Sequence, residues 1–286
     1  MRHEVSPYGK LGTYIGKMPE SEIKKIVIIG AGNVATNLAQ ALRKAGFDII
    51  QIYGRTNHLA KALADKVKSS YTSNLSDLNM EGDIYFISVV DSAFKNILKK
   101  INIDDKLIVH TSGSIPMNIL NNTSKNYGVF YPLQTFSKQK KPDFENIPIC
   151  LEANSDRNLK LLTSLAKTIS KNVHIINSEQ RAALHLSAVF ACNFSNHMYV
   201  IAENILLKHN ISFDMIKPLI NETAKNIEDH RPHKVQTGPA KRGDHEIIAK
   251  HLELLADNPD FREIYKIITQ NIIKYKNQTD KSDDKL

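Results

Sequence analysis

An aliphatic run that ends in a glycine turn and opens into a helix constrains this chain more than any other feature. The run and the turn read Ile26-Val27-Ile28-Ile29-Gly30-Ala31-Gly32-Asn33-Val34-Ala35. In a strand–turn–helix setting, this G-x-G-x-x-A spacing is typical of a dinucleotide-binding loop. Gly30 permits the tight turn, Gly32 lets the backbone approach a pyrophosphate, and a small residue lets the helix pack on the strand. The N–H groups of Asn33 and Val34 open the helix and face the anion, so these four residues are candidate cofactor-binding residues.

The second strand indicates which dinucleotide the loop binds. The stretch 48–53 predicts this strand, and Gly54, Arg55 and Thr56 follow it. Sites for NAD usually carry Asp or Glu about 20 residues past the glycines, where the carboxylate holds the ribose 2′-hydroxyl. A carboxylate would repel a 2′-phosphate, whereas a guanidinium binds it bidentately and a hydroxyl donates to it. Arg55 and Thr56 therefore favour NADP as the cofactor, and the alternative is that Arg55 is only a solvated residue after a strand.

Strands alternate with helices up to residue 177, and the strand signal then disappears. The first half predicts an α/β fold, an N-terminal Rossmann domain with a doubly wound, mostly parallel sheet. The remainder predicts an all-α C-terminal domain. The expected parts are a flexible extension (1–22), an NADP-binding Rossmann domain (23–177), a helical substrate and dimerisation domain (178–276) and a disordered tail (277–286). The expected C-terminal helices are 179–208, 213–229, 245–256 and 259–275.

The composition excludes several classes of protein. The chain of 286 residues has a formal net charge of +8, but its lysines are scattered and form no arginine-rich stripe, so we expect no nucleic-acid partner. No apolar run approaches membrane-spanning length, which predicts no membrane association. Cys150 and Cys192 lack the spacing of a redox or metal motif, so a reducing cytoplasm is expected. His230 and His233 have no neighbouring ligand set that would complete a metal site.

Ligands of open α/β sheets bind outside the carboxyl ends of the strands. Val90 follows one central strand and is expected to border the ribose and nicotinamide of the cofactor, while its neighbour Asp91 is interpreted as a turn or capping residue. His110 and Ser112 follow the next strand and are candidates for contact with the substrate. The alternative for these segments is ordinary loop chemistry, because Ser, Thr and Gly are common in turns. A third segment, 131–136, follows the next strand.

The long helix expected at 179–208 carries a polar ridge within a mostly apolar sequence. His185, Asn193, Asn196 and His197 project within about a third of the helix circumference. Either this ridge faces solvent or it lines a polar cleft, and His185 and Asn193 are the candidate catalytic residues on it. The loop 230–244 is either a connector or, through Arg242 and Asp244, a segment that orients an anionic substrate or the phosphates.

Taken together, these stretches resemble a family of bacterial Rossmann-like proteins with a C-terminal helical domain of unknown function. The family is related to pyrroline-5-carboxylate reductase, the deazaflavin-dependent NADP reductases and the 6-phosphogluconate dehydrogenase-like superfamily. The matching stretches are Ile28 to Ala35, Val109 to Gly113, Tyr131 to Phe136, His185 with Asn193-Phe194, and Thr237 to Ala240 with Arg242 to Asp244. The resemblance implies hydride transfer with NADP and homodimerisation through the helical domain. Hydroxyacid dehydrogenases of this superfamily carry Lys-x-x-x-Asn on the long helix, whereas Val189 precedes Asn193 here. Imines and other carbonyl-type compounds therefore remain candidate substrates.

Two functions are consistent with the sequence. The first is an NADP(H)-dependent oxidoreductase that transfers a hydride to or from a small carbonyl or imine substrate, with a proton donor among His110, Ser112, His185 and His197. The cofactor would supply the chemistry and the protein the orientation. The alternative is a non-catalytic NADP-binding sensor or regulatory protein that acts through its helical domain.

Overall fold

The computed structural model of the protein describes residues 23–137 and 142–283. By the density of its internal contacts the chain divides into two compact units, one extending to Cys192 and the other beginning at Asn193. The flexible extension expected at 1–22 lies outside the described residues. The domain boundary expected at 177 follows the last strand, which ends at Ile175, whereas the two compact units divide after Cys192.

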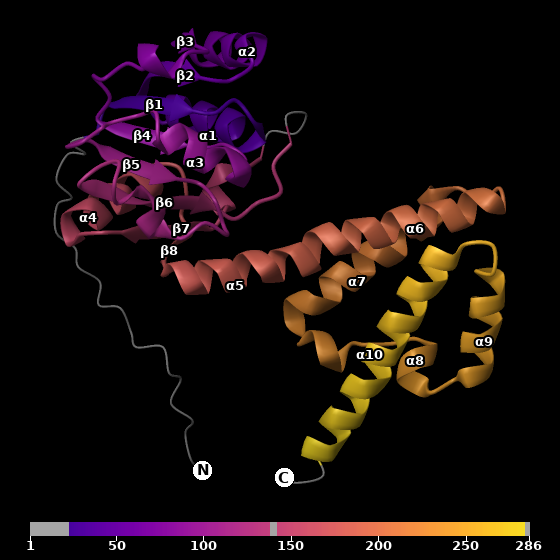
Figure 1. The fold of residues 1–286 in the computed structure, drawn as a ribbon. Coiled ribbons are helices and arrows are strands. Elements are labelled where there is room, and N and C mark those ends of the chain that lie inside the picture. The colour runs from indigo at the N-terminus through magenta and orange to yellow at the C-terminus, as the bar shows by residue number, and fades with distance from the viewer. Residues whose placement is uncertain (1–22, 138–141, 284–286) are drawn as a thin grey trace, which may run out of the picture. The chain divides into compact units, whose positions relative to one another are not determined.

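The first unit is built on an eight-stranded sheet in the order β3-β2-β1-β4-β5-β6-β7-β8 (Figure 1). All neighbouring strands are parallel except β6 and β7, which are antiparallel. The strand order changes direction between β1 and β4: β2 and β3 are added on one side of β1, and the later strands are added on the other side. This is the doubly wound arrangement, and the expected fold class is confirmed. The strands are β1 (Lys25–Ile29), β2 (Asp48–Tyr53), β3 (Ser70–Thr72), β4 (Ile84–Ile87), β5 (Leu107–His110), β6 (Asn126–Pro132), β7 (Ile149–Ala153) and β8 (Val173–Ile175).

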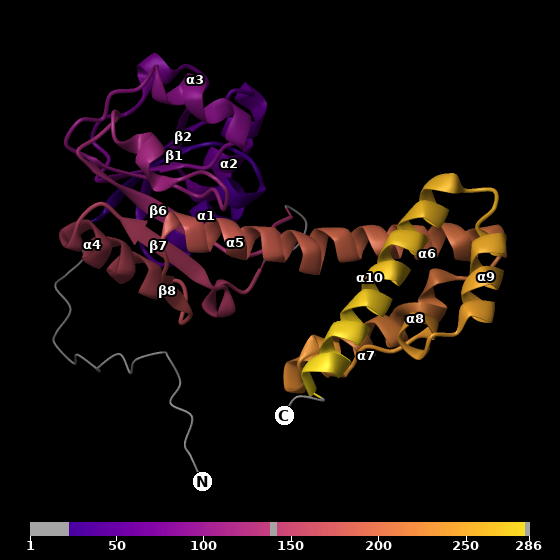
Figure 2. The same cartoon turned by 60° about the horizontal axis from the view of Figure 1, so that its bottom comes forward.

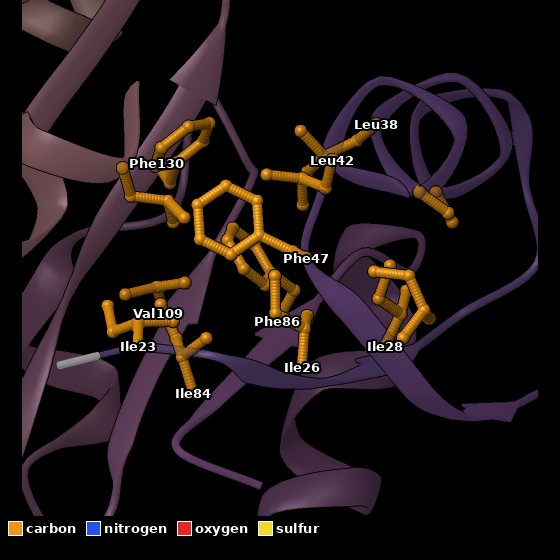
Figure 3. Packing of buried hydrophobic residues seen from close by; sticks show 14 of the residues in the cluster. Ile23, Ile26, Ile28, Leu38, Leu42, Phe47, Ile84, Phe86, Val109 and Phe130 are labelled. Atoms are coloured by element: carbon orange, nitrogen blue, oxygen red, sulfur yellow. The ribbon is translucent and has the colours of Figure 1, made fainter. Parts of the chain in front are cut away.

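Alternation along the strands divides the buried side chains between the two faces of the sheet. Ile26 and Ile28 of β1 belong to one core cluster, and Val27 and Ile29 belong to the other, as the two-residue period of a strand requires. Helices α1 (Asn33–Lys44), α2 (Asn57–Val67) and α4 (Asp156–Lys167) contribute to the first cluster, and α3 (Phe94–Leu98) contributes to the second. Figure 3 shows the first cluster, in which Phe86 and Phe130 meet edge to face with ring centroids 5.3 Å apart.

The helix expected over 179–208 is helical throughout, but it is not a uniform α-helix. It consists of α5 (Ser178–Ala188), a π-helical segment (Val189–Phe194) and α6 (Ser195–Lys208). The stretch contains no Gly or Pro that would end a helix, which is why the sequence predicts its continuity. The wider π turn has no signal in the residue types, although π turns are frequent at functional sites.

Among the described residues, the second unit contains α6 and four further α-helices, of which α10 is the longest (Figure 2). They are α7 (Lys217–Asp229), α8 (Pro239–Arg242), α9 (His245–Leu254) and α10 (Pro259–Asp283). The α-helix expected from Phe213 begins at Lys217, because Pro218 favours the first turn of a helix. The short α8 lies within the stretch 230–244 that was expected to be a loop, and it ends at Gly243 in the left-handed conformation. Helix α10 continues past Tyr275 to Asp283, so most of the stretch expected as a disordered tail is helical.

Burial differs greatly between the two units. The first unit contains nearly all of the buried hydrophobic residues, whereas Ala240 and Thr269 are the only buried side chains among the residues of the second unit whose burial is described. Within 23–137 and 142–283, no helix combines the length and apolar character needed to cross a bilayer.

Candidate active site

The glycine loop after β1 is held by close contacts that only glycine permits. Gly30 has a φ of +137°, and a Cβ on it would lie 2.0 Å from the carbonyl oxygen of Ser88, just after β4. A Cβ on Gly54, just after β2, would lie 3.2 Å from Cβ of Ala31 in the loop. The ends of β1, β2 and β4 are thus packed together at the carboxyl edge of the sheet.

Gly32 has the opposite environment, since a Cβ on it would meet nothing within 4 Å. It is the N-cap of α1, and no side chain caps this helix. The N–H groups of the first helical turn have no partner within the helix itself. The open space over Gly32 and these N–H groups fit an anionic pyrophosphate, because a helix N-terminus favours negative charge.

The side chain of Asn33 has a structural role that the sequence did not predict. Its amide donates a hydrogen bond to the carbonyl of Phe136 at 3.0 Å, and the amide of Asn37 donates to the carbonyl of Ser137 at 2.9 Å. The loop after β6 is therefore tied to the first turns of α1, next to the glycine loop. Val34 is partly buried, whereas Val90, just after β4, is 69% exposed and offers apolar surface at the same edge of the sheet.

Arg55 and Thr56 lie in the connection between β2 and α2. Arg55 is exposed, and Thr56 is the N-cap of α2 but its hydroxyl makes no capping hydrogen bond. Neither side chain has a hydrogen bond or an ion pair with the part of the chain that the structure describes. Both are therefore available to an anionic ligand.

His110, at the end of β5, is fully buried. Its Nδ1 accepts a hydrogen bond from the N–H of Ser112 at 3.2 Å, and its Nε2 has no partner within the described residues. Burial, assisted by the positive charge of Arg181, lowers the pKa of His110 to about 3. The imidazole is therefore neutral near neutral pH, and it holds the loop after β5 in place. Its catalytic assignment is not tested by this geometry and stays a prediction.

The hydroxyl of Ser112 belongs to a small cluster around Asp91. It donates to one carboxylate oxygen of Asp91 at 3.0 Å, and the hydroxyl of Ser114 donates to the other. Ser112 also accepts hydrogen bonds from the N–H groups of Ser114 and Ile115. This pairing of the loops after β4 and β5 was not predicted from the sequence, where Asp91 was interpreted as a turn or capping residue.

A buried ion pair joins the start of α5 to the sheet. The side chain of Arg181 is 1% exposed and pairs with Glu152 of β7. Its guanidinium also donates to the carbonyl of Ile115 at 2.6 Å, and the hydroxyl of Ser178 donates to Glu152 at 2.8 Å. This network was not predicted from the sequence. Its one signal in the sequence is Glu152, a single acid near the end of the otherwise apolar strand β7.

His185 lies one helical turn after Arg181 and reaches the same edge of the sheet. A Cβ on Gly113 would lie 2.6 Å from Cγ of His185, so the imidazole occupies the space that a side chain at residue 113 would fill. Nδ1 of His185 is 3.0 Å from the phenol oxygen of Tyr131 on β6. Tyr131 was part of a candidate segment but not a candidate residue, because nothing local in the sequence indicates its partner.

The remaining candidates belong to the second unit. Asn193 is exposed within the π-helical segment, and His197 is exposed on α6. Asp244 caps α9 by accepting a hydrogen bond from the N–H of Ile247 at 3.2 Å, which is a structural role. The catalytic assignment of Asn193 stays a prediction. No group of three or more His, Cys, Asp or Glu side chains in the described ranges is placed to hold a metal ion.

Two family sequence models match the chain. The model for coenzyme F420-dependent NADP oxidoreductases matches residues 25–113, and the model for a domain of unknown function (DUF2520) matches residues 147–272. A crystal structure from Bacteroides fragilis, provisionally described as an NADP oxidoreductase, is 46% identical and has a TM-score of 0.85. The match covers 89% of this chain and 100% of that chain. No curated protein sequence matches significantly.

More distant solved structures share the fold. An imine reductase from Myxococcus stipitatus, in complex with NADP⁺, is 14% identical with a TM-score of 0.62, and the match covers 90% of this chain and 94% of that chain. A 1-pyrroline-5-carboxylate reductase from Streptococcus pyogenes is 16% identical with a TM-score of 0.58, and the match covers 87% of this chain and 98% of that chain.

Gly32→Val is expected to separate cofactor binding from folding. The valine side chain projects into the open space in which the pyrophosphate would lie, so NADPH affinity should fall at least about tenfold, or about 1.4 kcal/mol. The free energy of unfolding should change by at most about 1 kcal/mol, since only an N-cap position is altered. Calorimetric titration and denaturant unfolding measure the two effects. Normal NADPH binding by a folded Gly32→Val protein would contradict the assignment, and Gly30→Ala, which clashes with Ser88, is the contrasting variant that should not fold normally.

His110 is expected to make stability depend on pH. Its pKa is about 3 in the folded protein and about 6.5 in an unfolded chain, so the unfolded state takes up a proton first as the pH falls. The free energy of unfolding should therefore decrease from about pH 6.5 towards pH 3, by up to about 1.4 kcal/mol per pH unit.

Urea unfolding at several pH values in this window measures that slope. His110→Asn removes the titrating group but keeps an oxygen that can accept from the N–H of Ser112, so its slope should be shallower than that of the wild type. His58→Asn removes an exposed imidazole on α2 and is the matched control. Equal slopes in the wild type and His110→Asn would show that His110 does not titrate as described.

Proposed function

The chain belongs to the same family of NADP oxidoreductases as the Bacteroides fragilis protein. We propose that it transfers a hydride between NADP(H) and a small carbonyl or imine substrate. The observation that carries the proposal is the carboxyl edge of the sheet in the first unit. There an uncapped helix N-terminus with open space over Gly32 lies near Arg55 and Thr56, and an imidazole hydrogen-bonded to a phenol lies against the loop after β5. The names of the Myxococcus stipitatus and Streptococcus pyogenes proteins both concern reduction of a carbon–nitrogen double bond, which supports the imine class.

NADP is the proposed cofactor because a cation and a hydroxyl, Arg55 and Thr56, follow the second strand. The guanidinium of Arg55 can pair with a 2′-phosphate. The hydroxyl of Thr56 makes no capping hydrogen bond, so it can donate to the same phosphate. The glycine loop would hold the pyrophosphate, and the exposed Val90 would cover the ribose and nicotinamide. When bound, the cofactor supplies or accepts the hydride.

Of the candidate proton donors in the first unit, His185 fits best. His110 is buried and neutral, and the hydroxyl of Ser112 is already bound to Asp91. His185 is only partly buried, and its Nε2 has no partner within the described part of the chain. The non-catalytic sensor is not favoured, because membership in a family of oxidoreductases supports an enzyme.

We further propose that the helical unit completes its core with a second copy of the chain. Within its described residues almost nothing is buried, while large apolar side chains are exposed on several of its helices. They include Phe194, Tyr199 and Val200 near the start of α6, Leu219 and Ile227 of α7, and Ile267 and Ile268 of α10. A helical unit needs a buried apolar face to be stable, and symmetric homo-oligomers are the commonest way to supply one.

The protein is therefore expected to be a dimer in solution. Sedimentation equilibrium should give twice the mass of one chain, which is 32.2 kDa. Ile267→Glu, on α10, should shift the equilibrium towards the monomer, because burying an unpaired carboxylate is costly. Ile175→Glu makes the same change at an exposed position on β8 of the first unit and should remain dimeric. A monomeric, well-folded wild type would contradict the proposal.

Oxidation of NADPH in the presence of cyclic imines and keto acids tests the function. The protein should oxidise NADPH with at least one member of this panel, and NADPH should bind at least about tenfold more tightly than NADH. Arg55→Ala should raise the KM for NADPH at least about tenfold and leave that for NADH unchanged, because only the 2′-phosphate contact is lost.

Lys44→Ala is the control for the charge change, since it removes one exposed cation at the other end of α1. An unaltered cofactor preference in Arg55→Ala would contradict the NADP assignment. Absence of turnover across the whole panel, with NADPH bound, would contradict the reductase proposal.

A further inference from the structure

The face of α5 that meets the sheet is defined by Arg181 and, one helical turn later, by Leu184 and His185. Arg181 is anchored by Glu152, Leu184 packs on the cluster that contains Tyr131, and His185 lies beside Leu184. Positions i, i+3 and i+4 share one side of a helix, so the anchor and the packing contact fix where His185 projects.

The imidazole of His185 is also confined on two sides. The backbone at Gly113 leaves no room for a Cβ, which would lie 2.6 Å from the ring. The ring of Tyr131 meets it edge to face, with centroids 6.0 Å apart and an interplanar angle of 78°. The ring of His185 is therefore held in one orientation by helix, loop and strand together.

The hydrogen bond between these rings has a preferred direction. Burial raises the pKa of Tyr131 to about 12, so the phenol keeps its proton. Within the described residues the phenol oxygen has one hydrogen-bond partner, Nδ1 of His185. If Nδ1 of a neutral imidazole donated instead, the phenol proton would be left without an acceptor at a nearly buried position, which costs about 1–3 kcal/mol. The phenol therefore donates, and the hydrogen of the neutral imidazole is on Nε2.

We infer that Tyr131 is a positioning residue that keeps His185 in the Nε2–H tautomer, so that Nε2 can donate a proton to the substrate. This inference rests on the proposed function. When bound, the reduced cofactor would supply the hydride to the carbon of the C=O or C=N bond. The oxygen or nitrogen receives the proton of Nε2, Nδ1 receives the phenol proton, and the resulting phenolate takes a proton from water, which leaves hydroxide in the solvent. The imidazole thus gives up one proton and gains another, and never has to become an imidazolate.

The tautomer can be measured without any substrate. Long-range ¹H–¹⁵N spectra of protein labelled at histidine, recorded at about pH 9, well above the ordinary imidazole pKa of about 6.5, distinguish Nδ1–H from Nε2–H. His185→Gln assigns the signal among the 11 histidines. The wild type should show His185 with hydrogen on Nε2, and Tyr131→Phe, which keeps the ring, should show a mixture of tautomers.

Kinetics test the consequence for turnover. Tyr131→Phe should lower kcat at least about tenfold and leave the affinity for NADPH unchanged, because general acid catalysis contributes at least that much. Tyr127→Phe is the matched control: it removes a phenol from the same strand, where the Tyr127 side chain has no hydrogen bond within the described chain.

Each result decides a separate part of the inference. An Nδ1–H tautomer in the wild type, or an unchanged tautomer in Tyr131→Phe, would overturn the positioning role whether or not the protein is a reductase. Wild-type kcat in Tyr131→Phe would overturn the proton transfer. If no substrate of the panel is turned over, the proposed function and the proton transfer fail together, while the tautomer spectra still decide the hydrogen bond.

Discussion

The buried pair of Arg181 and Glu152 holds the first unit together at the place where its chemistry is proposed. It connects three segments that are distant in sequence, because the guanidinium also binds the carbonyl of Ile115 in the loop after β5. Such a pair need not add net stability relative to apolar residues of the same size, but loss of one partner leaves a buried charge, which typically costs about 3–5 kcal/mol. The position of α5 on the sheet, and with it that of His185, depends on this pair remaining intact.

His110 and His185 lie at the same edge of the sheet, but their different surroundings give the two imidazoles different roles. His110 is fully enclosed, and its free energy of protonation is dominated by burial and by the charge of Arg181. His185 is only partly buried, and its ring is oriented by Tyr131. The first imidazole therefore shapes a loop, while the second keeps its Nε2 without a partner among the described residues, which is the atom that the proposed function assigns to the substrate. A sequence places both after an apolar stretch and cannot distinguish them.

The sequence was sufficient for features set by local patterns. The parallel strands, the glycine loop and the order of helices follow from periodicity and from residues such as Gly30 and Pro259, whose conformational preferences are intrinsic. The contacts that build the rest of the site are long-range. Arg181 on an Ala-rich helix looks like a solvated charge until β7 brings Glu152 beside it, and Tyr131 gains its role only when α5 crosses the end of β6. The π-helical turn likewise depends on packing and has no signature in the residue types.

The wedging of the glycine loop between the ends of three strands has a thermodynamic consequence. Since Gly30 lies against Ser88 and Ala31 against Gly54, the loop is already fixed before any ligand arrives. Little backbone entropy then remains to be lost on association, and the interactions of the bound molecule contribute to affinity almost undiminished. The backbone entropy of the loop is lost when the sheet folds, and it is therefore not lost again when the ligand binds.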